Sequence, residues 1–112
     1  IQLSEEDASL WFSLALLEVR EGNSGAALIA LEEAASLEEP PGYYHYVYAV
    51  AQHDHGLPAQ AIATLKAVNH AAPGQLNVLA ALMQYSQQAG EVQAASRYRD
   101  ALRHTAQAAG LQ

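Results

Sequence analysis

The chain has 112 residues, 51% of them hydrophobic, which is enough for one domain with a buried core. It contains no cysteine, and this excludes disulfides, thiolate metal sites and covalently attached haem within the segment. The net charge of −7 is uneven, because residues 1–41 hold nine acids and one base while residues 42–112 hold three acids and four bases. Nucleic acid is therefore a poor partner, since phosphate contacts need clustered lysine and arginine.

Glycines and prolines divide the chain into helical segments rich in alanine, leucine, glutamine and glutamate. Ser4 is the expected N-cap of the first helix, and Pro58 fits the first turn of the fourth, where its missing N–H costs nothing. The uncharged stretch 67–90 is interrupted by polar residues and by Pro73, so we expect no membrane span. The predicted helices cover about residues 5–21, 24–38, 43–55, 58–72, 75–89 and 91–108.

The chain repeats itself with a fixed period of 34 residues, which indicates one helix-turn-helix unit used three times. A glycine ends the first helix of each pair, where a left-handed backbone is often needed. An alanine follows each glycine by five residues, and we expect it where two helices cross. The glycines are Gly22, Gly56 and Gly90, and the alanines are Ala27, Ala61 and Ala95.

The repeated positions resemble the pattern of the tetratricopeptide repeat (TPR) family over residues 8 to about 105. That pattern opens with Trp-x-x-Leu-small, present here as Trp11, Leu14 and Ala15. Its later positions are Gly22, Ala27, Leu31, Ala34 and Pro40 in the first unit, Tyr48, Ala49, Gly56, Ala61, Leu65, Val68 and Pro73 in the second, and Leu79, Leu82, Met83, Gly90, Ala95 and Leu102 in the third.

The resemblance implies a single all-α domain over residues 1–112, a right-handed superhelical stack of three antiparallel helix pairs, as in TPR α-solenoids. Its units would cover about 8–41, 42–75 and 76–109. Trp11 would fill the first interhelix space, and His45, at the tryptophan position of the second unit, would be a buried, hydrogen-bonded core residue. Arg99 stands at an apolar position of the family, so the last helix would face water on one side.

In such a stack the first helix of each pair lines a concave groove, which implies a non-enzymatic scaffold that binds a peptide or helix. The first helix of the chain carries an apolar stripe at i, i+4 and i+7, formed by Phe12, Leu16 and Val19. Together with aromatic residues of the third helix, this stripe could anchor a partner. The predicted contact residues are Phe12, Leu16, Val19, Arg20, Tyr43, Tyr46, Val50, His53, Asn77 and Gln84.

Two alternatives remain open for the apolar first helix. An upstream helix of a longer protein could cover it, since the chain begins with Ile1 and its only methionine is Met83. A second copy could also cover it, in an assembly domain where the acidic first unit of one copy meets the basic last helix of another.

The run 46–51 is also similar, more weakly, to repeat modules joined to multihaem cytochromes in some bacteria. The compartment stays open between cytoplasm and periplasm.

Catalysis, cofactors and metals are not expected from this sequence. No Gly-rich phosphate loop, His-Glu-x-x-His motif or nucleophile elbow occurs in it. His53 and His55 are two residues apart on a helix, so they do not share a face and would not meet one metal ion.

Overall fold

The computed structural model describes residues 5–110, and within that range it contains six α-helices and no strand. The bounds confirm the predicted all-α class and place each described helix end within two residues of its predicted position. Ser4, the expected N-cap, lies outside the described residues. The helices are α1 (Glu5–Arg20), α2 (Ser24–Ser36), α3 (Tyr43–Asp54), α4 (Pro58–Ala71), α5 (Leu76–Gln88) and α6 (Val92–Ala108).

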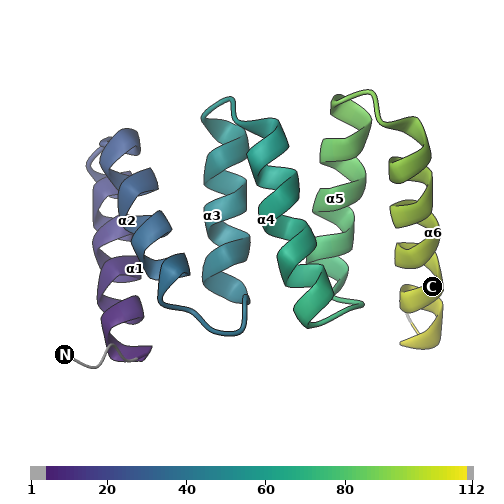
Figure 1. The fold of residues 1–112 in the computed structure, drawn as a ribbon, viewed down its shortest axis with the longest axis horizontal. Helices are drawn as coiled ribbons and strands as arrows, with labels where there is room; N and C mark the ends of the chain where they lie inside the picture. Colours follow the sequence, from purple (N-terminus) through teal and green to yellow (C-terminus); the bar gives the residue numbers. More distant parts are fainter. Residues whose placement is uncertain (1–4, 111–112) are drawn as a thin grey trace.

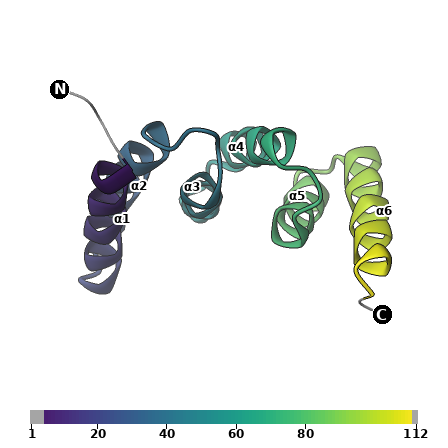
Figure 2. The ribbon, with the colours of Figure 1, turned by 90° about the horizontal axis from the view of Figure 1, so that it is seen from below.

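The helices pack against one another in chain order, forming the pairs α1–α2, α3–α4 and α5–α6. Further contacts between α2 and α3 and between α4 and α5 join the pairs into a row with extents of 41 × 28 × 23 Å (Figure 1). Seen from below, α2 and α4 lie on one side of the row and α3 and α5 on the other, with α3 and α5 on the inner side of a shallow curve (Figure 2). Each pair therefore contacts only its neighbours, as expected for a repeated hairpin.

The turn inside each pair is the same structure built three times. Gly22, Gly56 and Gly90 have φ values of 80°, 76° and 79°, in the left-handed region that residues with a Cβ rarely adopt. After each glycine, the next backbone N–H donates to a carbonyl five residues before it, with N···O distances of 2.8 to 2.9 Å. This hydrogen bond is part of the Schellman motif that closes a helix C-terminus. The three matching glycines thus confirm the predicted repeat.

Alanines allow the helices of each pair to approach closely. Ala27, Ala61 and Ala95, which follow the turn glycines by five residues, are all buried. The larger core cluster joins α3, α4 and α5, and the most enclosed of its large side chains are Leu65 and Leu82. A smaller cluster joins α1, α2 and α3. The core is therefore strongest in the middle of the row and weakest at its first helix.

Trp11 does not fill an interhelix space, and that prediction is wrong. Its side chain is exposed and helps to line an open depression with Leu10 and Leu14. The reason is that, within residues 5–110, no helix lies against this side of α1. Arg99 is exposed, as predicted for the outer face of α6.

Candidate interaction surface

The predicted contact residues all lie on the first helices of the three pairs, and they fall into groups with different surroundings. Figure 2 shows α3 and α5 on the inner side of the row, so residues of these helices can share one face. The residues are Phe12, Leu16, Val19 and Arg20 on α1, Tyr43, Tyr46, Val50 and His53 on α3, and Asn77 and Gln84 on α5.

An aromatic cluster connects α1 with the start of α3; it consists of Phe12, Tyr43, Tyr44 and Tyr46. The ring of Phe12 stacks on Tyr44, with centroids 4.7 Å apart, and meets the edge of Tyr43 at 5.9 Å. Tyr43 is in turn stacked with Tyr46 at 6.5 Å. Phe12 and Tyr46 are half-buried, whereas Tyr43 is exposed, so the cluster offers an aromatic surface to solvent. The structure thus brings three of the predicted contact residues together.

Tyr44 belongs to this cluster although it was not among the predicted contacts. A signal was present in the period, because Tyr44 stands 34 residues before Val78 and 34 after Leu10. Val78 is buried where α5 meets the preceding pair. Residues at this register point back toward the preceding pair, and in α3 that direction leads to Phe12.

The apolar surface of α1 continues beyond the aromatic cluster. Leu16, Val19 and Arg20 follow Phe12 at i+4, i+7 and i+8, and all three are exposed. Residues at these spacings lie on one face of a helix. The predicted apolar stripe therefore exists, with its first member packed and its later members open.

His53 marks a second group, where α3 meets α5. Its imidazole lies flat against the ring of Tyr85, with centroids 3.8 Å apart and planes 3° apart. Its Nε2 is 2.6 Å from Oε1 of Gln88, and its Nδ1 is 3.8 Å from Oδ1 of Asp54. Burial, followed by the charges of Asp54 and Tyr46, raises the pKa of Tyr85, which keeps its phenol neutral. Sequence reasoning missed Tyr85, because its partner is distant along the chain.

The remaining predicted contacts are less distinctive. Val50 is half-buried, and Gln84 is exposed. The side-chain oxygen of Asn77 accepts a hydrogen bond of 2.9 Å from the backbone N–H of Val78, in the first turn of α5. Asn77 therefore already serves the start of its helix.

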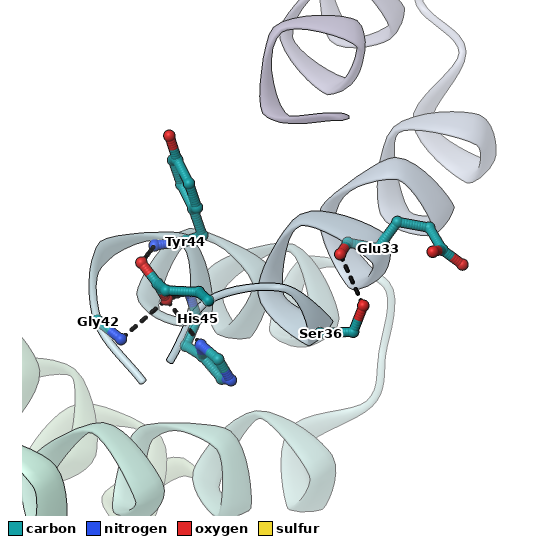
Figure 3. A network of polar contacts seen from close by, with 6 residues as sticks. Glu33, Ser36, Gly42, Tyr44 and His45 are labelled. Carbon is teal, nitrogen blue, oxygen red and sulfur yellow. Dashed lines mark hydrogen bonds and ion pairs between the residues drawn. The ribbon is translucent and has the colours of Figure 1, made fainter. Parts of the chain in front are cut away.

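The position of α3 is fixed by a carboxylate that sequence reasoning overlooked. Oε1 of Glu38 accepts hydrogen bonds from the backbone N–H groups of Gly42 and His45 at 2.8 and 3.0 Å, and it lies 2.7 Å from Nδ1 of His45. Oε2 accepts the N–H of Tyr44 at 3.0 Å. In Figure 3 the backbone nitrogens of Gly42 and Tyr44 and the ring of His45 converge on this one carboxylate. Glu38 thus holds the helix start that carries the aromatic cluster.

Two details show how closely Glu38 and the start of α3 fit. A Cβ added to Gly42 would lie 3.2 Å from Oε2 of Glu38, so the glycine allows this approach. Burial alone would raise the pKa of the Glu38 carboxyl, but the hydrogen bonds from His45 and from the backbone N–H groups outweigh it and hold that pKa below its ordinary value. His45, expected as a buried core residue, is half-buried, and its expected hydrogen bond is made to Glu38.

The described residues were also compared with the needs of metal and membrane sites. The Nδ1 of His55 is 3.0 Å from the carbonyl of Ala51, within its own helix end. Among residues 5–110, no three histidine, cysteine, aspartate or glutamate side chains come together as metal ligands would. Over the same range, no helix has both the length and the apolar character needed to cross a bilayer.

Comparison with known proteins gives no match, either to a model of a protein family or to a curated protein. The resemblance to tetratricopeptide repeats therefore remains a prediction from the period of the sequence.

Proposed function

We propose that this chain is a non-enzymatic interaction module of the tetratricopeptide kind, which binds a peptide or helix on the face formed by α1, α3 and α5. In this proposal the row of helix pairs is a right-handed solenoid, and the inner side of its curve is the groove. The observation that carries the proposal is the aromatic cluster, in which the exposed Tyr43 stands beside the half-buried Phe12 and Tyr46.

Aromatic side chains suit this role, because they offer a large contact area and lose little conformational freedom on binding. Tyr43 is 61% exposed, although it contacts three other rings or ring edges nearby. The exposed Leu16 and Val19 extend the apolar surface along α1. An amphipathic helix could lay its apolar side across these residues, with anchors spaced by one turn.

The charge of the first unit selects among such partners. Residues 1–41 carry nine acids and one base, so the field around α1 and α2 is negative. A partner with basic residues flanking its apolar side would be drawn to this surface and held in register, whereas an acidic one would be repelled. We therefore propose a basic amphipathic segment as the partner.

Two synthetic helical peptides test the proposal; they share one apolar side but carry either lysine or glutamate around it. Each is titrated into the isotope-labelled chain, and amide chemical shifts are followed by NMR. The lysine peptide should give saturable shifts on the inner side of α1 and α3, and the glutamate peptide should give much weaker ones. Shifts confined to other faces, or none with either peptide, would contradict the proposal.

A pair of exposed side chains separates the proposed surface from general stickiness. Tyr43→Ser should weaken the lysine peptide about tenfold, as expected for an aromatic anchor. Ile29→Ser is the matched control, because Ile29 on α2 is 63% exposed, close to the 61% of Tyr43. Equal weakening by both substitutions would argue against an anchor at the aromatic cluster.

A further inference from the structure

One end of the helix row presents a bare apolar face, which we call the α1 end face: Leu10, Trp11, Leu14 and Leu17. Their side chains are 68%, 37%, 40% and 43% exposed. Leu10, Leu14 and Leu17 follow one another at i, i+4 and i+7, so they form one stripe with Trp11 beside it. This stripe is on the opposite side of α1 from Phe12, and it takes no part in the aromatic cluster.

The repeat shows what normally covers this stripe. One and two periods later, the same register positions point at the second helix of the preceding pair. In α5 they are Val78, Leu79, Leu82 and Tyr85, whose exposure is 0 to 7%. Val78 and Leu82 pack with Leu65 of α4. In α3, Tyr48 occupies this register and packs with Leu31 of α2, and its hydroxyl donates to Glu32. The α1 end face is therefore shaped to receive a helix of the same kind as α2 or α4.

The α1 end face is also hollowed and bordered by a charge. Leu10, Trp11 and Leu14 line an open depression of about 300 Å³, and Asp7 lines it with them. A tryptophan ring next to a carboxylate suits a guanidinium group, which can stack on the ring while its apolar stem covers leucine side chains.

Such a guanidinium is carried by α6, the helix at the opposite end of the row (Figure 1). Arg99 stands at the position that Leu31 and Leu65 hold in α2 and α4, where those leucines reach the next pair. Val92, Arg99 and Arg103 are spaced by seven and four residues, so they share one face of α6, and all three are exposed. In α6 the face that should meet a following pair is thus open and basic.

We propose that the α1 end face binds the outer face of α6 from a second copy of this chain, so that copies join head to tail. The α6 helix would lie on α1 as α2 lies on α3 and as α4 lies on α5. Arg99 would reach the depression beside Trp11, and Val92 would add apolar contact. This contact continues the row of helix pairs, with one helix supplying the arginines and the other the acidic, apolar face.

Charge favours this arrangement over a symmetric one. Two first units placed face to face would bring together two segments that each hold nine acids and one base. Head-to-tail contact instead sets the acidic first unit against α6, which carries three arginines and one aspartate. The contact is heterologous, so it leaves a free α1 end face and a free α6 at the ends of every assembly. Its strength should fall with salt, because exposed charges are screened.

Two variants, each blocked at one end, test this geometry. Trp11→Lys adds a positive charge to the α1 end face and leaves α6 intact. The double substitution Arg99→Ser with Arg103→Ser removes the arginines and leaves the α1 end face intact. Mixed together, the two variants retain one complete contact and should form a 1:1 dimer. Arg97→Ser is the matched control, because Arg97 is exposed on α6 but two residues from Arg99, on another face.

Sedimentation velocity over a range of protein concentrations gives the readout. The wild-type chain and Arg97→Ser should form growing assemblies at low salt that dissociate as salt rises. Each blocked variant alone should associate at least tenfold more weakly, and circular dichroism should show an unchanged helical fold. Leu10→Lys, at the most exposed position of the face, replaces Trp11→Lys if that variant loses helicity.

Three outcomes would overturn the proposal: a wild-type monomer at every concentration in low salt, blocked variants that assemble alone as the wild type does, or a dimer that strengthens with salt. The last result would point to a symmetric contact between two α1 end faces. The aromatic cluster is not involved, so Tyr43→Ser should assemble like the wild type even though it weakens peptide binding.

Discussion

Glu38 and His45 meet in the link between the first and second helix pairs, with Oε1 of the carboxylate 2.7 Å from Nδ1 of the imidazole. The same carboxylate accepts the backbone N–H groups of Gly42, Tyr44 and His45. These groups lie at or next to the start of α3, where backbone donors lack partners inside the helix. The Glu38 side chain therefore acts as an N-cap supplied from outside the helix.

Glu38→Ala should lower the free energy of unfolding by about 1–2 kcal/mol, because several charge-assisted hydrogen bonds to the start of α3 are lost. Urea unfolding followed by circular dichroism measures the change. Glu39→Ala is the control, since Glu39 is the exposed neighbour and should change stability by less than about 0.5 kcal/mol. Equal effects of the two substitutions would show that the cap contributes little.

The Glu38 cap should also make stability depend on pH. Hydrogen bonds hold the pKa of folded Glu38 below the ordinary value of 4.5, so the ionised carboxyl stabilises the fold. This contribution is fully present above pH 4.5 and is lost as pH falls through the lower folded-state pKa. The difference in melting temperature between wild type and Glu38→Gln should therefore be largest near neutral pH and shrink on acidification. A difference that stays constant down to about pH 3 would contradict this linkage.

The stacked rings of His53 and Tyr85 should couple α3 to α5 energetically. A double-mutant cycle with His53→Ala and Tyr85→Leu isolates the pair from the burial of each side chain. We expect a coupling free energy of about 0.5–1.5 kcal/mol, as found for other aromatic contacts. The measurement is urea unfolding of the four proteins at one pH. Additive effects of the two substitutions would mean that the stacking does not stabilise the fold.

Trp11 and Leu79 occupy the same register position in the first and third units, but their surroundings differ. Leu79→Ala should lower the free energy of unfolding by about 2–5 kcal/mol, because it leaves a cavity in a packed core. Trp11→Ala should cost less, under about 2 kcal/mol, although it removes more atoms, because the ring is already partly in water. Both are measured in dilute protein at high salt, so that association does not contribute. A larger loss for Trp11→Ala would imply that the indole is packed more tightly than the structure shows.

Gly56 and Gly25 differ in backbone conformation and should respond oppositely to alanine. Gly56 has φ of 76° in the turn before α4, so Gly56→Ala should cost about 1–2 kcal/mol. Gly25 lies within α2 with open space around it, and Gly25→Ala should stabilise by about 0.5–1 kcal/mol. Thermal melts of the two variants give the comparison. A neutral Gly56→Ala would show that the left-handed turn is not required.

Helix positions and turn types could be predicted because they depend on neighbours in sequence. The left-handed glycines, the break at Pro40-Pro41-Gly42 and the helix-favouring composition act over a few residues, and the period of 34 multiplies each signal by three. For the same reason Ala61 could be placed at a helix crossing. Apolar residues at helical spacing likewise placed Phe12 on the side of α1 that meets α3.

Other features depended on packing between elements, which the sequence pattern does not specify. His53 and Tyr85 are 32 residues apart, and their stacking depends on how α3 and α5 lie across one another. Glu38 looked like one of several surface acids until the chain turned at Gly42 and aimed three N–H groups at it. Trp11 carries the family residue for a filled interhelix space, but burial requires a neighbouring helix. The sequence thus determined six helices and their repeated turns through local backbone preference, and the tertiary structure decided which apolar faces are covered, because coverage depends on what lies beside them.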